Sequence, residues 1–291
     1  MLRTAARRSD RIRGPHREHH AASVEPTPKT HPRLFTEDGK RKWKVPPAGV
    51  KVEQNTAKNG TWIERWPAPA KKGQPLKWVY NYTLEEVQRR AGIKFAENRE
   101  LAKHIPAIRA QVARDLGSEG KTREVAMVLT LIDRLYLRVG GEESAANDHF
   151  GATTLEKEHV RVNGNSIRLT FVGKSGVNWD VSLTDAKLAQ QMKQQLSKAK
   201  GSRVFGVDAD DVNRYLAPFG ATAKKFRTFH ATRLAREELL KLADAPVGQR
   251  AQRVNEAVAR VAAKLGHTPA VSRESYIDPM VIVAYMKGKL R

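Results

Sequence analysis

The sequence contains no cysteine, and acidic residues and apolar runs are scarce. The lack of cysteine excludes thiolate catalysis, disulfide bonds and cysteine-based zinc sites, and it fits a reducing compartment. No window approaches the roughly 18 consecutive apolar residues that a membrane-spanning helix needs, so no such helix is expected. Only 31 Asp and Glu stand against 53 Lys and Arg, which gives a net charge of +22. This excess favours a polyanionic partner, and we expect nucleic acid because no amphipathic membrane segment is present.

Composition divides the 291 residues into three regions. Residues 1–30 carry seven Lys or Arg, three acids and almost no large apolar side chain, which is typical of a disordered basic tail. An organellar transit peptide is the alternative for this segment, but the acids and the lack of an amphipathic period speak against it. Residues 31–90 are predicted to form a small β-rich domain and residues 91–291 a larger helical one, since the chain is long enough for two cores.

Short β-forming runs separated by turn residues characterise the region 31–90. The runs at 49–54, 61–66 and 76–80 are the expected strands. Four of the five tryptophans fall in this region among lysines and arginines. They indicate either a domain core or a basic face laid against duplex DNA, and both can hold because strands alternate their faces. Lys42 and Lys44 are the residues we expect on DNA phosphates there.

The region 91–291 combines helical periodicity with one β segment. Helices are expected over 83–116, with Pro106 ending one and opening another, and then through 125–136, 184–200, 209–216 and 254–265. Alternating runs at 160–162, 167–171 and 177–183, joined by glycine-containing turns, predict a three-stranded antiparallel meander. The predicted fold class is therefore α+β, with a small N-terminal antiparallel β-domain and a larger, mainly α-helical domain that contains this meander.

A histidine and a tyrosine near the end of the chain suggest chemistry. A helix is expected to stop at Gly266, and Thr268 and Pro269 to start a second, short one. Tyr276 follows His267 by nine residues, which on one continuous helix would place the two on opposite faces at about 100° per residue. The break between them permits them to converge. A lone tyrosine here would otherwise be a half-buried residue on a packed helix.

Three cations upstream favour the chemical interpretation, although each alone fits an ordinary surface charge. Arg138 is expected in the last turn of a helix. Lys174 lies at the tip of a glycine-flanked turn, which would let it move against a ligand. Arg227 falls near the start of a long helix, an unfavourable place for a cation unless an anion binds there.

In this order the residues resemble those of the type IB DNA topoisomerases, in their compact poxviral and bacterial form, and more distantly those of the tyrosine recombinases. The resemblance runs from about residue 83 to 285 and is weaker over 31–82, where Val45-Pro46-Pro47-Ala48 is similar to the N-terminal β-domain of that family. The matching segments are Leu137-Arg138-Val139-Gly140, Thr153-Thr154-Leu155, Gly173-Lys174-Ser175-Gly176-Val177, Asp211-Val212-Asn213, Thr222-Ala223-Lys224-Lys225-Phe226-Arg227-Thr228, Leu265-Gly266-His267-Thr268-Pro269-Ala270-Val271 and Ser275-Tyr276-Ile277.

The resemblance implies a role for each residue. Tyr276 would be the nucleophile, Arg138, Arg227 and His267 would stabilise charge on the phosphate, and Lys174 would be the general acid. Lys224 and Lys225 would bind DNA. A free phenol with a pKa of about 10 is ionised in only roughly one molecule in 10³ at neutral pH, so nearby cations are needed. The implied activity relaxes supercoiled double-stranded DNA through a 3′-phosphotyrosyl intermediate, with no ATP, metal or other cofactor, and with one chain acting as a clamp.

Two alternatives remain at this stage. A tyrosine recombinase shares the chemistry, but its pattern would place histidine three residues before the second arginine, where this chain has Lys224. A non-catalytic architectural DNA-binding protein fits the charge but gives no reason for five aligned residues. We expect a DNA-associated protein without a membrane partner, in the bacterial cytoplasm or nucleoid, with an organelle or a nucleus as the other settings.

Overall fold

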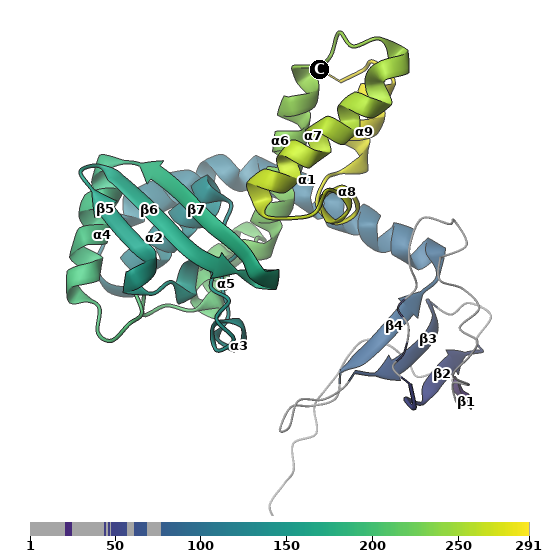
Figure 1. Ribbon diagram of the computed structural model, residues 1–291, viewed down its shortest axis with the longest axis horizontal. Coiled ribbons are helices and arrows are strands. Elements are labelled where there is room, and N and C mark those ends of the chain that lie inside the picture. The colour runs from purple at the N-terminus through teal and green to yellow at the C-terminus, as the bar shows by residue number, and fades with distance from the viewer. Residues whose placement is uncertain are drawn as a thin grey trace, which may run out of the picture. The chain divides into compact units, whose positions relative to one another are not determined.

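The computed structural model describes residues 21–24, 44, 46, 48–56, 61–68 and 77–290. The chain forms two compact units, Met1–Lys94 and Phe95–Arg291 (Figure 1). The division between them falls inside the first long helix, α1 (Leu84–Asp115). Within the described part of the chain, each helix is too short or too polar to cross a membrane.

The first unit is an antiparallel sheet whose strands follow in sequence order (Figure 1). Its strands are β1 (Ala21–Val24), β2 (Val52–Asn55), β3 (Trp62–Pro67) and β4 (Trp78–Tyr82). Strand β1 belongs to the segment 1–30 that was expected to be a tail, yet its backbone pairs with β2 from Val24 opposite Val52 to Ala21 opposite Asn55. The other residues of that segment lie outside the described part.

The tryptophans of this unit lie in two kinds of environment, the core and the surface. Trp66 is buried with 2% of its surface exposed and belongs to the core. The Arg65 guanidinium lies 5.0 Å from the centroid of the Trp62 ring and 4.5 Å from that of Trp78, which is exposed. Such cation–π contacts hold a positive charge against aromatic surface. Core packing and a basic aromatic face therefore both occur, while Trp43 lies outside the described residues.

Helices dominate the second unit. After α1 they are α2 (Gly120–Leu135), α3 (Glu142–Ala145), α4 (Ala186–Lys198), α5 (Ala209–Leu216), α6 (Ala223–Leu240), α7 (Arg250–Leu265), α8 (Pro269–Ser275) and α9 (Pro279–Met286). Short 3-10 helices lie at Ala152–Thr154, Lys157–His159, Lys174–Gly176, Ala217–Phe219 and Val247–Gln249. Together with the sheets they confirm the predicted α+β class.

The expected break at Pro106 is wrong, because α1 runs through it without interruption. Proline in a helix interior removes one backbone hydrogen bond and costs about 3 kcal/mol in isolation. Leu101, Ile105 and Ile108 on either side of it are each at most 3% exposed and pack into the core of the second unit. Their burial offsets the cost of the proline.

The predicted meander is confirmed as a three-stranded sheet of β5 (Val160–Asn163), β6 (Ser166–Gly173) and β7 (Val177–Thr184). The register pairs Asn163 with Ser166 at the first turn and Gly173 with Val177 at the second. Alternate residues of β6 are buried, which is the period-two pattern read from the sequence. Helix α4, capped by the Asp185 carboxylate, packs beside β5 and β6.

The buried apolar side chains of the second unit form two clusters, and α6 contributes to both. Ala223 and Phe226, near the start of α6, belong to the cluster around α2, α4, α5 and the meander. Ala231, Leu234 and later residues belong to the cluster formed with α7 and α9, which make up the upper lobe in Figure 1. The first turns of α6 therefore lie where the two clusters meet.

Candidate active site

The chain bends between His267 and Tyr276, as the sequence allowed. Helix α7 ends at Gly266, which adopts a left-handed conformation with φ of 60°. The Thr268 hydroxyl accepts a hydrogen bond from the Val271 backbone N–H at 3.3 Å and so starts α8. Tyr276 follows α8 with φ of −133°. The His267 and Tyr276 rings consequently stack, with centroids 4.2 Å apart and planes inclined by 29°.

Arg227 lies beneath these two rings with 3% of its surface exposed. Its Nη1 donates to the Tyr136 carbonyl, and its Nη2 donates to the Leu265 carbonyl and to Nε2 of His267. Tyr136 and Leu265 end α2 and α7, and carbonyl groups at helix C-termini carry partial negative charge. These carbonyls stabilise a cation near the start of α6, so the position of Arg227 does not by itself require a bound anion.

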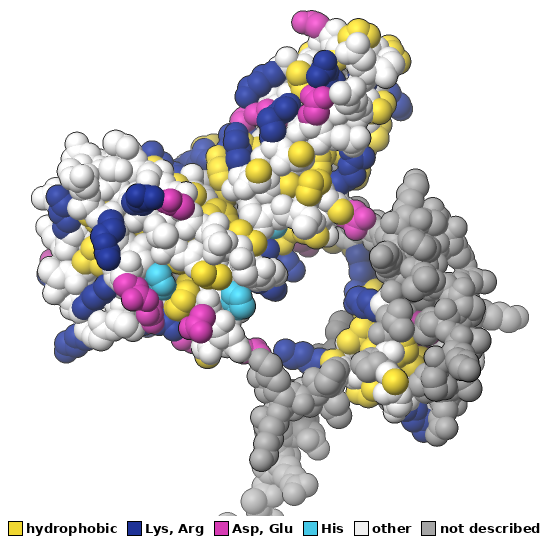
Figure 2. Space-filling view, viewed as in Figure 1, with side chains coloured by type: hydrophobic (Ala, Val, Ile, Leu, Met, Phe, Trp, Pro, Cys, Tyr) yellow, Lys and Arg dark blue, Asp and Glu magenta, His cyan; other side chains and the backbone are white. Residues whose placement is uncertain are grey.

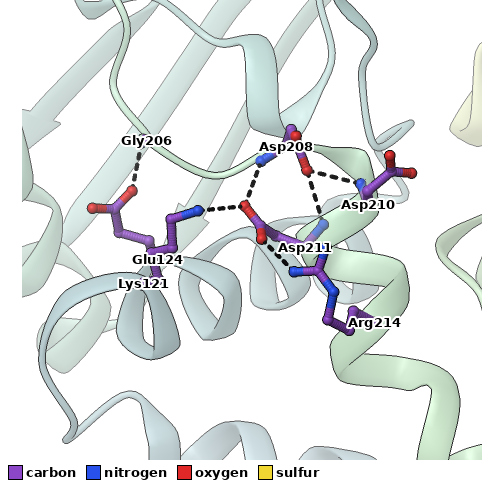
Figure 3. A network of polar contacts seen from close by, with 7 residues as sticks. All are labelled: Lys121, Glu124, Gly206, Asp208, Asp210, Asp211 and Arg214. Atoms are coloured by element: carbon purple, nitrogen blue, oxygen red, sulfur yellow. Dashed lines mark hydrogen bonds and ion pairs between the residues drawn. The ribbon is translucent and has the colours of Figure 1, made fainter. Parts of the chain in front are cut away.

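One polar side chain of α5 caps the start of α6, and a second one ties α5 to α2. The Asn213 side-chain oxygen accepts from the Ala223 backbone N–H at 3.0 Å, in place of a cap by Thr222. Two residues earlier, the Asp211 carboxylate accepts a hydrogen bond from Nζ of Lys121 of α2 at 3.2 Å (Figure 3). The segment Asp211-Val212-Asn213 thus links α2, α5 and α6, and it orients the helix that carries Arg227.

The hydrogen bonds of His267 define its tautomer in this arrangement. Arginine can only donate, so Nε2 of His267 accepts from Arg227 at 2.5 Å. The ring proton then belongs on Nδ1, which lies 3.3 Å from Oγ of the fully buried Ser272. Burial and the charges of Arg227 and Arg138 lower the pKa of His267 to about 3. The imidazole is therefore neutral at physiological pH.

Arg138 lies in irregular chain after α2, not in the last turn of a helix as expected, because Tyr136 ends α2 in a left-handed conformation with φ of 59°. The backbone around it is held by a second segment. The Arg138 carbonyl accepts from the Ala152 N–H at 2.8 Å. A Cβ on Gly151 would lie 2.5 Å from the Gly140 nitrogen, so the two segments are in backbone contact.

The Tyr276 hydroxyl lies in a cationic environment. Burial raises the cost of ionising it, but the charge of Arg138, a hydrogen bond from Arg138, and the charges of Arg227 and Lys224 together lower its pKa below the ordinary value. The Arg227 guanidinium carbon is 5.9 Å from the ring centroid. In turn, burial and the neighbouring Arg138 lower the pKa of Arg227 to about 10. The cluster is rich in positive charge, which favours an anionic ligand.

The structure therefore brings Arg138, Arg227, His267 and Tyr276 together. Lys174 is exposed at the tip of the β6–β7 turn, and among the described residues no hydrogen bond or ion pair joins it to those four residues.

The four lysines expected on DNA differ in their surroundings. Lys224 is exposed on the first turn of α6. Lys225 is partly buried and paired with Glu97 at 3.2 Å. Lys44 is exposed in the first unit, and its backbone N–H donates to Asn81 at 3.1 Å. Lys42 lies outside the described residues.

Three residues that support Tyr276 were missed by the sequence analysis. The Thr232 hydroxyl donates to the Tyr276 carbonyl at 3.2 Å and accepts from the Asp278 N–H at 3.0 Å. Asp278 caps the start of α9, and its carboxylate also binds Arg99 of α1 at 2.6 Å. Tyr136 supplies a carbonyl to Arg227. No pattern marks Thr232, since it faces neighbours more than 40 positions away.

Charge extends over the surface beyond the site. In the face shown in Figure 2, Lys and Arg side chains stand out over the lobe formed by α6, α7 and α9. Among the described residues, no group of three or more His, Asp or Glu side chains is arranged to hold a metal ion. The chemistry that the arrangement itself offers is stabilisation of a phosphate beside a phenol.

Comparison with known proteins shows the family of this chain. The family described as the catalytic core of eukaryotic DNA topoisomerase I matches residues 86–285. The DNA topoisomerase 1B of Acanthamoeba polyphaga mimivirus is 28% identical over 280 residues, which are 85% of this chain and 79% of that protein. The mitochondrial DNA topoisomerase I of Rattus norvegicus is 34% identical over 160 residues, 50% of this chain and 27% of that protein.

The chain thus spans most of the viral relative but about a quarter of the rat protein. Among solved structures, the XerH site-specific recombinase bound to its difH substrate aligns with a TM-score of 0.38 and 16% identity, over 63% of this chain and 50% of that one. The family match covers well over half of the sequence and includes every residue of the candidate site. This chain belongs to the family of the eukaryotic DNA topoisomerase I catalytic core.

Proposed function

We propose that this chain relaxes supercoiled DNA by cutting one strand, letting it rotate about the other, and resealing it. The observation that carries the proposal is the convergence of the Tyr276 phenol with Arg138, Arg227 and His267. A phenol whose pKa is lowered by two guanidinium groups is suited to attack a phosphodiester, and the same groups can hold the charge that develops on the phosphate oxygens.

In the proposed cleavage step, Oη of Tyr276 forms a bond to phosphorus, and the bond from phosphorus to the 5′-oxygen breaks. The phenolic proton passes to solvent, and Lys174 gives a proton to the leaving 5′-oxygen. General acid catalysis of this kind contributes about 10²–10⁴-fold. Each guanidinium contact to the phosphate is worth roughly 3 kcal/mol in the transition state, or about two orders of magnitude in rate.

The 3′-phosphotyrosyl bond conserves the energy of the phosphodiester, so neither ATP nor a metal enters the reaction. Rotation of the free 5′-end then changes the linking number. In resealing, the 5′-hydroxyl loses its proton to Lys174 and attacks phosphorus, and Tyr276 leaves.

Binding of a phosphate requires a local rearrangement. Nε2 of His267 now accepts from Arg227, so it has no proton to offer a phosphate oxygen. We propose that the phosphate draws the Arg227 guanidinium away from this nitrogen. The Ser272 hydroxyl can then donate to Nδ1, which moves the ring proton to Nε2 and makes it a donor to the phosphate.

Plasmid relaxation without ATP and with a chelator tests the proposal. The protein should relax supercoils, Tyr276→Phe should abolish relaxation, and denaturation during turnover should trap a DNA adduct on Tyr276. A tyrosine recombinase would instead join strands of two duplexes, and an architectural protein would leave the linking number unchanged. Loss of relaxation on chelation would show that the mechanism is wrong.

We further propose that one chain is sufficient and that both units hold the duplex as a clamp, with Lys42, Lys44, Lys224 and Lys225 on phosphates. Mixing Tyr276→Phe protein with Arg227→Ala protein tests the first point, since restored activity would mean that two chains share a site. Bacterial cytoplasm or nucleoid is the proposed setting, and co-localisation with stained DNA in cells would check it.

A further inference from the structure

One indole ring lies between two glycines that each precede a residue of the proposed mechanism. A Cβ added to Gly173 would lie 2.7 Å from Nε1 and 2.8 Å from Cδ1 of Trp179. A Cβ added to Gly266 would lie 3.0 Å from Cζ2 and 3.4 Å from Cε2 of the same ring. The pyrrole edge of Trp179 thus contacts the residue before Lys174, and its benzene ring contacts the residue before His267.

The indole is well held on its own strand. Phe171 lies opposite Trp179 in the β6–β7 register, and the two rings stack with centroids 6.1 Å apart and planes inclined by 7°. Phe171 is itself 6% exposed, so it provides a firm base. Val177 adds a second contact from β7, because its Cγ1 would lie 3.1 Å from a Cβ on Gly266.

The two glycines are not equally constrained by their backbones. Gly266 has φ of 60°, where a side chain is already strained. Gly173 has φ of −97° and ψ of −176°, which any residue can adopt. At Gly173 the space taken by the indole is therefore the reason that a side chain does not fit.

We propose that Trp179 is a positioning residue, which sets the separation between the turn that carries Lys174 and the turn that carries His267. Lys174 is exposed on a short turn, so its ammonium group needs a fixed reference to meet the leaving oxygen. The indole supplies this reference by joining the Lys174 turn to the end of α7. This inference rests on the proposed function, and in particular on Lys174 as the acid.

The nature of the leaving group provides a direct test. A duplex with sulfur in place of the 5′-oxygen at the scissile phosphate has a leaving group that departs without a proton, so the general acid becomes unnecessary. Under single-turnover conditions, Lys174→Ala should cleave the oxygen substrate at least about 10²-fold more slowly and the sulfur substrate at nearly the wild-type rate. This variant shows whether Lys174 is the acid.

Trp179→Leu should then behave as a weaker form of Lys174→Ala. We expect a roughly 10–100-fold loss on the oxygen substrate, because a displacement of about 1 Å can cost that much, and near-complete recovery on the sulfur substrate. A merely structural defect would slow both substrates equally and lower the melting temperature in proportion. Equal loss on both substrates, or no loss on either, would overturn the inference.

Matched variants separate the contact from its surroundings. Val181 lies on the same strand as Trp179, and both line a cavity of about 410 Å³. No Val181 atom is among those nearest to Gly173 or Gly266. Val181→Ala should therefore keep the cleavage rate within a few-fold of wild type. Gly173→Ala should slow cleavage of the oxygen substrate alone. In combination with Trp179→Leu it should add little further loss, because the indole that the new Cβ would meet is then absent. If wild-type protein cleaves neither substrate, the proposed function fails. If it cleaves both, but the rate losses of Gly173→Ala and Trp179→Leu add up in the double variant, only the positioning role fails.

Discussion

Arg227 is a buried cation that is held by backbone carbonyls at the ends of two helices. Its guanidinium is held by the carbonyls of Tyr136 and Leu265, and its Nε lacks a hydrogen-bond partner among the described residues. Helix-end carbonyls orient the group without neutralising it, whereas a carboxylate would form a full ion pair and compete with phosphate. The positive charge that the proposed phosphodiester substrate would need is thus kept next to the Tyr276 ring.

The pH dependence of folding should report on His267. Its pKa in the folded protein is about 3, below its ordinary value of 6.5, so the unfolded chain binds the proton more readily. The contribution of His267 to the free energy of unfolding is fully present above about pH 6.5 and is lost as the pH falls towards 3. His267→Gln should therefore weaken the fall in unfolding free energy between pH 6.5 and 4, measured by urea denaturation.

Part of the acid dependence should persist in that variant. Burial also lowers the pKa of His230, against the opposing effect of its partner Asp133, so His230 contributes in the same direction. An acid profile of His267→Gln identical to that of the wild type would show that the imidazole is not buried neutral in this site.

Lys224 and Lys225 are neighbours with different expected effects on the nucleophile. The charge of Lys224 helps to lower the pKa of Tyr276, whereas Lys225 is paired with Glu97. Lys224→Ala should raise the pKa of Tyr276, so single-turnover cleavage at saturating DNA should fall a few-fold at pH 7 and recover as the pH rises. Lys225→Ala is the matched control and should leave the pH profile in place. The same shift of the pH profile in both variants would mean that the substitutions affect general DNA binding and not the pKa of Tyr276.

At the scale of elements, the backbone contact between the Arg138 segment and the segment before Ala152 offers a sharp comparison. Gly151 and Gly141 both have extended backbones, with φ of −151° and −167°. A Cβ on Gly151 would meet the Gly140 backbone at 2.5 Å, whereas a Cβ on Gly141 would meet no atom within 4 Å.

Gly151→Ala should therefore separate the two segments, destabilise the protein by about 1–3 kcal/mol and displace Arg138. Cleavage should fall by up to about 10², since misplacement of 1 Å costs that much. Gly141→Ala should leave the melting temperature and the cleavage rate close to wild type. Equal effects of the two substitutions would show that the close approach does not govern Arg138.

Helices and strands could be predicted where residues close together in the sequence determine them. Strands β5 to β7 followed from alternation and turn glycines, and the break between His267 and Tyr276 followed from Gly266 and Pro269. The end of α2 did not, because Tyr136 adopts a left-handed conformation without any residue type that favours it. The continuity of α1 through Pro106 depends on tertiary burial, which neighbouring residues in the sequence do not reveal.

At the scale of the second unit, the candidate site occupies the junction of two hydrophobic clusters. Helix α6 buries residues on different sides along its length, first towards α2 and then towards α7 and α9. A single apolar stripe, which is what periodicity detects, is therefore absent from it. The sequence supplied the residues of the site through resemblance, but the convergence of the ends of α2, α7 and α8 on Arg227 required the fold.

The basic N-terminal segment gives a prediction for the whole molecule. Residues 1–20 contain six arginines, and strand β1 begins at Ala21, so a deletion of 1–20 removes the charge and leaves the pairing of β1 with β2 intact. If these arginines contact phosphates, the slope of log binding constant against log salt should decrease in magnitude by up to about 5, at 0.9 for each phosphate. Filter binding at salt concentrations from about 50 to about 200 mM measures this slope. Cleavage of a saturated short duplex at low salt should stay unchanged, because the four residues of the candidate site lie outside the segment. A slope equal to that of the full chain would show that the segment does not bind DNA, and a slower cleavage step at saturation would show that it acts on the site itself.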